Sequence, residues 1–104
     1  MKFRKRPVVI EAFQMTKERR LDNSEWPNWL NRAWNKNFNE VGAVSCEDYP
    51  NSKASEGIAD RLIIRTLEGI HYVGWNDWII QGVKGELYPC KPDIFEATYE
   101  PVEN

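Results

Sequence analysis

The clearest hydrophobic pattern in the chain is a series of short apolar stretches over residues 61–101. These stretches are rich in Ile, Leu, Val, Trp and Tyr, which favour β-strands, and they cover residues 61–67, 70–73, 78–81 and 86–88. Turn residues separate them at Glu68-Gly69, residues 74–77 and residues 82–85. This close spacing predicts an antiparallel β-meander over residues 61–101 that curls into a partial barrel.

The first half of the chain contains one strand pattern and one helix pattern. Residues 7–15 are predicted to form a strand, because β-branched residues follow a proline placed where no ladder N–H is lost. Over residues 26–36 the apolar side chains recur at helical spacing, namely Trp26, Trp29, Leu30, Ala33 and Trp34. They cover a face of about 140°, which predicts one amphipathic helix packed on the sheet.

Polar segments connect these elements. Residues 16–22 are predicted to be a charged connection, and residues 41–45 a short strand. Residues 47–60 are rich in turn formers and predict a mobile loop. Residues 91–95 suit one helical turn, and residues 96–100 predict a final extended segment, whose pairing with the first strand the sequence leaves open. Together the elements predict a single α+β domain, mainly β, over residues 1–104.

The composition agrees with one small globular domain. At 104 residues the chain has room for one core, to which its five Trp, four Tyr and four Phe side chains must contribute much of the buried area. No apolar run approaches the roughly 20 residues of a membrane helix. The basic opening lacks a signal-peptide cleavage site, so we expect a cytoplasmic protein with Cys46 and Cys90 as free thiols.

The net charge of −2 conceals an uneven distribution. Residues 1–36 hold nine basic and four acidic side chains, whereas residues 37–104 hold five basic and twelve acidic ones. Either the basic part meets an anionic partner, or the two parts fold together and neutralise each other. The basic opening and Arg19-Arg20 offer phosphate contacts, but the acidic second half argues against a nucleic-acid partner.

Several segments resemble a group of small phage and prophage proteins that carry a Pro-Gly-Asp-Tyr/Trp turn and whose activity is not established. The resemblance covers about half of the chain and lies in Lys5-Arg6-Pro7-Val8-Val9-Ile10-Glu11-Ala12, Thr66-Leu67-Glu68-Gly69, Asp77-Trp78-Ile79-Ile80, Gly82-Val83-Lys84-Gly85-Glu86 and Tyr88-Pro89-Cys90-Lys91-Pro92-Asp93-Ile94-Phe95. This chain departs at the turn itself, where Trp75-Asn76-Asp77 replaces Pro-Gly-Asp. Asn tolerates a left-handed backbone, so the turn can persist, and Trp75 is either packed back onto the sheet or presented to a partner.

The residues offer no catalytic arrangement. His71 is the only histidine, and no nucleophile motif surrounds any serine or cysteine. Cys46, Cys90 and His71 lack the spacing of a metal site. Asp77 and Asp93 are expected to accept hydrogen bonds from turn or helix-start N–H groups. We therefore expect no enzyme, no metal and no cofactor.

Three functions remain open. The leading hypothesis, by analogy with small phage proteins, is a non-enzymatic accessory protein that binds a host protein, such as a defence or takeover factor. Trp34, Tyr49 and Trp75 are its candidate binding residues, because aromatic rings are enriched at protein interfaces. Asp77 of the turn and the basic opening at residues 2–6 are further candidates. A second hypothesis is a module that sequesters a nucleotide-like anion, with Arg61 or Arg65 meeting phosphate. The third is a virion or assembly component that self-associates.

Overall fold

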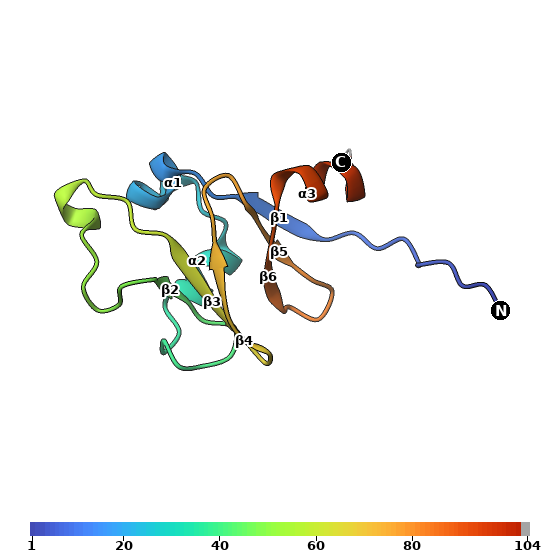
Figure 1. Ribbon diagram of the computed structural model, residues 1–104, viewed down its shortest axis with the longest axis horizontal. Helices are drawn as coiled ribbons and strands as arrows, with labels where there is room; N and C mark the ends of the chain where they lie inside the picture. Colours follow the sequence, from blue (N-terminus) through green and yellow to red (C-terminus); the bar gives the residue numbers. More distant parts are fainter. Residues whose placement is uncertain (103–104) are drawn as a thin grey trace.

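The computed structural model describes residues 1–102 as an α+β protein with two small antiparallel sheets (Figure 1). One sheet has the order β1-β5-β6 and is built from Glu11–Gln14, Trp78–Gln81 and Leu87–Cys90. The other has the order β2-β3-β4 and is built from Val44–Cys46, Leu62–Thr66 and Gly69–Val73. The α-helices are α1 at Lys17–Leu21, α2 at Asn28–Trp34 and α3 at Pro92–Thr98, with short 3₁₀ turns at Asn23–Glu25 and Ala54–Glu56.

Two of the three predicted hairpins form, whereas the hairpin predicted around residues 74–77 and the partial barrel are wrong. β3 pairs with β4 and β5 pairs with β6, whereas β4 and β5 belong to different sheets. The chain changes sheets at Gly74–Asp77, where Asn76 adopts a left-handed backbone with φ 71°. Its N–H donates to the Met15 carbonyl at 2.7 Å. This turn is therefore bonded to the end of β1, and β5 continues along β1 instead of along β4.

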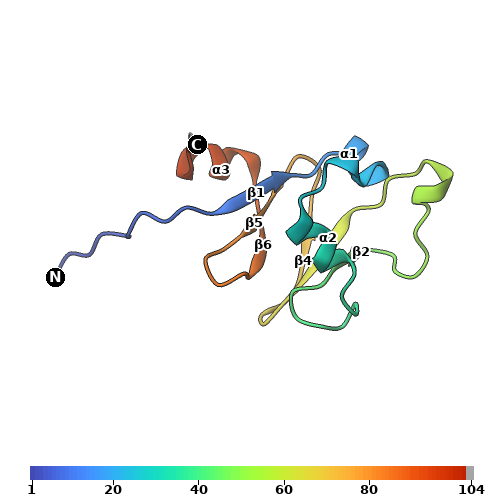
Figure 2. The same ribbon diagram turned by 180° about the vertical axis from the view of Figure 1, so that it is seen from behind.

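The core lies between the inner faces of the two sheets and helix α2 (Figure 2). Its fully buried side chains come from every layer and include Met15, Leu30, Leu62, Ile64, Val73 and Ile79. The helix predicted over residues 26–36 is confirmed but shorter. It begins after Pro27, whose backbone is extended at φ −65° and ψ 156°, and it ends at Trp34. Trp26, Trp29, Leu30 and Ala33 are buried, as the helical pattern predicts.

The two ends of the chain differ from the prediction. The predicted strand over residues 7–15 is right only for Glu11–Gln14, because β5 ends at Gln81, which lies opposite Glu11. Residues 1–10, called the arm below, extend away from the body in line with β1 (Figure 1). Near the other end, the helical turn predicted over residues 91–95 is confirmed, but as α3 it continues through Thr98 into the segment predicted to be extended. The described residues therefore include no final strand that pairs with β1. Phe95 of α3 stacks on Trp78 at 4.1 Å between ring centroids.

The charged connection predicted over residues 16–22 is in fact helix α1. Thr16 caps it, since its side-chain oxygen accepts the Arg19 N–H at 3.1 Å. Residues 47–60 contain no strand or α-helix, in agreement with the predicted loop. They are nevertheless anchored, because Arg20 of α1 forms a buried ion pair with Asp60. The charges of the first and second halves thus meet at this point of the interior.

Candidate binding surface

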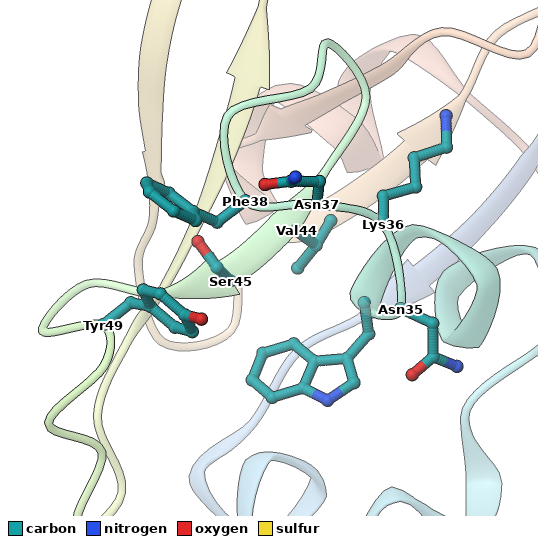
Figure 3. A pocket seen from close by; sticks show the side chains of 8 residues that line it. Asn35, Lys36, Asn37, Phe38, Val44, Ser45 and Tyr49 are labelled. Carbon is teal, nitrogen blue, oxygen red and sulfur yellow. The ribbon is translucent and has the colours of Figure 1, made fainter.

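The structure brings two of the predicted binding residues together. Trp34, at the end of α2, and Tyr49, after β2, line one hollow of about 510 Å³ (Figure 3). Residues of the connecting segment and of β2 complete the lining, namely Asn35, Lys36, Asn37, Phe38, Val44 and Ser45. We call this feature the aromatic hollow. Trp75, Asp77, Arg61 and Arg65 do not line it.

Phe38 and Tyr49 form the outer wall of the aromatic hollow. Their rings are stacked, with centroids 4.9 Å apart and planes inclined by 28°. Both remain exposed, at 46% for Phe38 and 55% for Tyr49. An aromatic pair with this much exposed surface is costly to leave in water, because each ring can bury a large apolar area. This pair is the most prominent apolar feature of the hollow.

Trp34 forms the inner wall, and its ring is contacted by Trp26 and Arg20. The Trp26 ring meets it edge-to-face at 5.8 Å and 87°, and the Arg20 guanidinium lies 5.1 Å from its centroid. The Trp26 indole N–H is itself fixed by a 2.7 Å hydrogen bond to the Arg19 carbonyl. Trp34 therefore has a defined orientation before any ligand binds. This reduces the conformational entropy that its side chain loses on binding.

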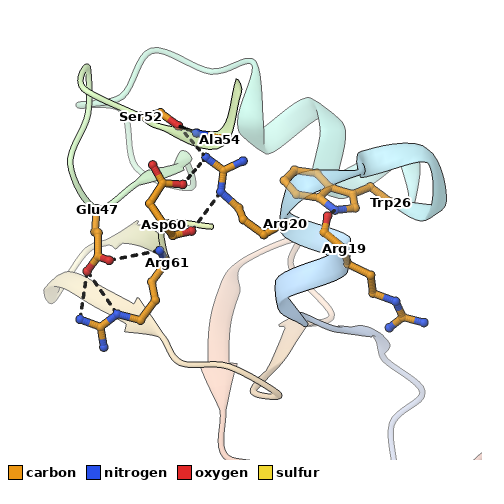
Figure 4. A network of polar contacts seen from close by, with 8 residues as sticks. All are labelled: Arg19, Arg20, Trp26, Glu47, Ser52, Ala54, Asp60 and Arg61. Carbon is orange, nitrogen blue, oxygen red and sulfur yellow. Dashed lines mark hydrogen bonds and ion pairs between the residues drawn. The ribbon is translucent and has the colours of Figure 1, made fainter. Parts of the chain in front are cut away.

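Arg20 owes its position to a polar network (Figure 4). Its guanidinium contacts the Asp60 carboxylate, and both side chains are buried, with exposed fractions of 6% and 7%. It also donates to the Asp60 carbonyl at 3.1 Å and to the Ser52 hydroxyl at 3.1 Å. A single side chain therefore connects α1, the loop over residues 47–60 and the back of Trp34.

Phe38 is the residue of this surface that the sequence reasoning missed. It lies in a polar stretch, Asn37-Phe38-Asn39, where no strand or helix periodicity draws attention to an aromatic ring. The sequence offered one signal for Phe38, namely a single aromatic residue between two asparagines that favour turns. Arg65 of β3 positions this segment, since its Nε donates to the Phe38 carbonyl at 3.1 Å. Arg65 thus supports the aromatic hollow without lining it.

The remaining predicted residues have other neighbours. Trp75 is partly buried against the core, with Lys17 Nζ 6.0 Å from its ring centroid, so the ring is packed back onto the body. Asp77 is buried and accepts hydrogen bonds from the Gly74 N–H at 2.8 Å and from Lys91 Nζ at 3.2 Å. This is the turn role expected for Asp77.

Arg61 lies on the outer face of the β2-β3-β4 sheet. Its guanidinium pairs with Glu47 at 2.9 Å and lies 5.4 Å from the centroid of the Tyr72 ring. The side-chain hydrogen bonds from Arg61 lower the pKa of the Glu47 carboxyl. Arg61 therefore already has an anionic partner within the chain and does not point into the aromatic hollow.

The polar groups of the aromatic hollow are mostly neutral. Asn35, Asn37 and Ser45 supply amides and a hydroxyl, and the one ionisable lining group besides the Tyr49 phenol is Lys36, whose Nζ lies 4.0 Å from Glu40. Within residues 1–102, no three His, Cys, Asp or Glu side chains are close enough together to hold a metal ion. No helix in that range is long and apolar enough to cross a membrane.

The chain matches no protein-family model, no curated protein and no solved structure. The resemblance to small phage and prophage proteins consequently stays a prediction carried by the sequence segments quoted above.

Proposed function

We propose that this chain is a non-enzymatic binding module, an accessory protein of a phage or prophage, and that it captures a host protein through the aromatic hollow. The observation that carries the proposal is the exposed Phe38–Tyr49 stack beside the fixed ring of Trp34. A cluster of aromatic rings with a polar rim is the composition of an interface hot spot.

The polar rim favours a protein partner over a purely apolar ligand. Asn35, Asn37 and Ser45 offer hydrogen-bond donors and acceptors around the rings, and Lys36 adds a single positive charge. Such a rim can pair with backbone amides and with acidic side chains of a polypeptide. We therefore expect the partner to insert one large apolar side chain between Trp34 and Tyr49 and to bond the rim with its main chain.

A matched pair of variants tests this role. Tyr49→Ala removes a 55% exposed tyrosine from the aromatic hollow, and Tyr72→Ala removes a 58% exposed tyrosine from the outer face of β4. Tagged wild-type and variant proteins are used to capture partners from host lysate, and the captured protein is purified. Its dissociation constant is then measured by calorimetry.

The expected result is at least about tenfold weaker binding for Tyr49→Ala, which corresponds to ~1.4 kcal/mol, and little change for Tyr72→Ala. Phe38→Ala should behave like Tyr49→Ala, because it removes the other half of the stack. A captured protein that binds both tyrosine variants as tightly as wild type would refute the aromatic hollow as the binding site.

A small ligand is the second candidate, and the volume of the hollow favours it. About 510 Å³ lies within the range of roughly 300–1,000 Å³ that is typical of ligand sites. The phosphate contacts suggested for Arg61 and Arg65 do not apply to this hollow, so a planar neutral or weakly anionic ring that stacks on Trp34 fits better. Native mass spectrometry separates the two candidates, since a small ligand adds hundreds of daltons and a host protein adds a polypeptide.

A further inference from the structure

We propose that the chain forms a symmetric dimer in which β1 and the adjoining arm residues of two copies pair antiparallel and join their sheets. The pairing segment is residues 8–12, called the edge segment below. The proposal concerns a different face from the aromatic hollow and does not depend on the proposed function. It starts from the position of β1, which is an outer strand of the order β1-β5-β6.

The hydrogen bonding of β1 shows which backbone groups face outward. Phe13 lies opposite Ile79, and the Met15 N–H donates to the Asp77 carbonyl at 2.9 Å. Bonded and non-bonded pairs alternate in an antiparallel ladder, so Glu11 and Phe13 bond to β5. Ala12 and Gln14 therefore direct their N–H and C=O groups away from β5. The Gln14 carbonyl confirms this direction, because it accepts a 2.7 Å hydrogen bond from Arg19 Nη1.

The arm runs on in line with β1 (Figure 1), and in the proposed dimer it keeps the same alternation. Val8 and Ile10, like Ala12, would then present their N–H and C=O groups on the open edge, whereas Pro7 and Val9 would face the side where β5 has already ended. Proline lacks an N–H, but at position 7 that group would lie on the inward side and have no partner. The open edge from Val8 to Ala12 is thus a continuous set of main-chain donors and acceptors, of the kind that recruits another strand.

The side chains of the edge segment favour a second copy as that strand. Phe13 packs against the core, so Ala12, Ile10 and Val8 alternate onto the α3 side of the sheet. With Ile10 opposite Ile10 of the second copy, Val8 lies opposite Ala12 and Ala12 opposite Val8. This register pairs the three apolar residues of one copy with the same three residues of the other, and each pair exchanges two main-chain hydrogen bonds.

A hollow lies beside the edge segment on the α3 side of the sheet. It has a volume of about 400 Å³ and is lined by the edge segment together with Trp78, Phe95, Tyr99, Glu100, Pro101 and Val102. In the proposed register Val8 of the second copy lies opposite Ala12, which has the smallest side chain of the edge segment. Val8 and Val9 are 51% and 72% exposed in the single chain, so pairing would bury apolar surface that is otherwise in water.

The positive charges of the two arms lie far from each other in this arrangement. Arg6 lies opposite Gln14 of the second copy, where Arg19 is bound, so the pairing segment ends at Val8 before these charges meet. Lys2, Arg4, Lys5 and Arg6 are all exposed, and Arg6 is the one nearest to the dyad at Ile10. The two Arg6 backbones would be separated by eight residue steps along the paired strands, or roughly 27 Å at about 3.4 Å per residue. This exceeds the Debye length of about 8 Å at physiological ionic strength, so their repulsion is screened.

Two neighbouring valines give a matched test on the full chain. Val8→Pro removes an N–H that faces the second copy, and Val9→Pro removes one that faces no strand. Both substitutions replace an exposed valine, and both keep the backbone extended. Sedimentation velocity over a range of concentrations measures the dimer dissociation constant, and circular dichroism checks that each variant is folded.

We expect a concentration-dependent dimer for wild type and for Val9→Pro, and a dissociation constant raised by at least about tenfold for Val8→Pro, which loses two symmetry-related bonds. A wild-type chain that stays monomeric at high concentration overturns the proposal, and so does an equal effect of the two prolines. Tyr49→Ala should dimerise like wild type, which separates this result from the test of the aromatic hollow.

A cysteine cross-link checks the register. In a Cys90→Ser background, Ile10→Cys places two thiols at the dyad, at a Cα separation of about 5.5 Å that a disulfide can span. Val9→Cys places its two thiols on opposite sides of the dyad and farther apart. Rapid disulfide-linked dimer formation by Ile10→Cys, and slow formation by Val9→Cys, is expected. The reverse order would overturn the register and the proposal with it.

Discussion

The guanidinium of Arg20 lies 5.1 Å from the ring centroid of Trp34 while it pairs with the buried carboxylate of Asp60. One side chain therefore supports the inner wall of the aromatic hollow and anchors the loop over residues 47–60. That loop also carries Tyr49, the outer wall of the same hollow. The geometry of the hollow and the order of the loop consequently depend on one buried ion pair.

Asp60→Ala should lower the free energy of unfolding by about 3–5 kcal/mol, because it leaves the Arg20 guanidinium buried without its carboxylate. Urea unfolding followed by Trp fluorescence measures the change. Glu40→Ala is the control, since it removes an exposed pair with Lys36 at 4.0 Å and should cost less than about 1 kcal/mol.

The double variant Arg20→Met/Asp60→Leu shows why Asp60→Ala is unstable. The cause is either the loss of the attraction between the two side chains or the unpaired charge left on Arg20. The double variant should recover a large part of the stability lost in Asp60→Ala, because no buried charge remains. If the two variants prove equally unstable, the cost lies in the packing around Trp34 and Ser52 instead of in the charge.

The Glu47–Arg61 pair predicts a dependence of stability on acid pH. Hydrogen bonds from Arg61 lower the pKa of Glu47 in the folded state, so the pair stabilises the fold above the unfolded pKa of about 4.3. This contribution is lost as the pH falls through the folded value. Glu47→Gln should therefore be less stable than wild type at pH 7, by less than about 1 kcal/mol because the pair is partly exposed.

The measurement is a series of urea titrations from neutral to acid pH on wild type and Glu47→Gln. The difference between the two proteins should shrink towards zero as the carboxyl becomes protonated. A difference that stays constant over this range would mean that Glu47 acts through its uncharged contacts, such as the 3.1 Å hydrogen bond with the Arg61 N–H.

The two cysteines should differ in reactivity. Burial raises the pKa of the Cys46 thiol, and only 1% of the residue is exposed, whereas Cys90 is partly exposed. An alkylating reagent should modify Cys90 in the folded protein and reach Cys46 only on unfolding, since reaction needs an accessible thiolate. Mass spectrometry of timed samples measures both rates. Equal rates in native buffer would contradict the burial of β2.

The turn between the two sheets should depend on the left-handed backbone of Asn76, at φ 71°. Asn76→Ala is expected to cost about 1 kcal/mol, and Asn76→Gly less, because glycine adopts this conformation without strain. Asn35→Ala is the control, since Asn35 has a right-handed backbone with φ −87°. Thermal unfolding of the three variants provides the comparison, and a similar loss for Asn35→Ala and Asn76→Ala would contradict the explanation.

Local sequence patterns were sufficient for the elements whose neighbours are close in the chain. The β3–β4 hairpin follows from two apolar runs around Glu68-Gly69, and the buried face of α2 follows from the spacing of Trp29, Leu30 and Ala33. In both cases the period of the side chains determines which face is apolar, and a short connection leaves one way to pair.

Contacts between distant residues determined the rest. Arg20 is buried beside its partner Asp60, forty residues away, and no local pattern in residues 16–22 reveals that pairing. At the point where the meander divides into two sheets, the Asn76 N–H bonds to the Met15 carbonyl. The stack of Tyr49 on Phe38 likewise joins residues that lie on either side of β2, which pairs with β3. The directions of side chains along each element therefore follow from local sequence alone. Which elements meet depends on the folded chain as a whole, because those contacts gain their free energy from burial shared by residues far apart in the chain.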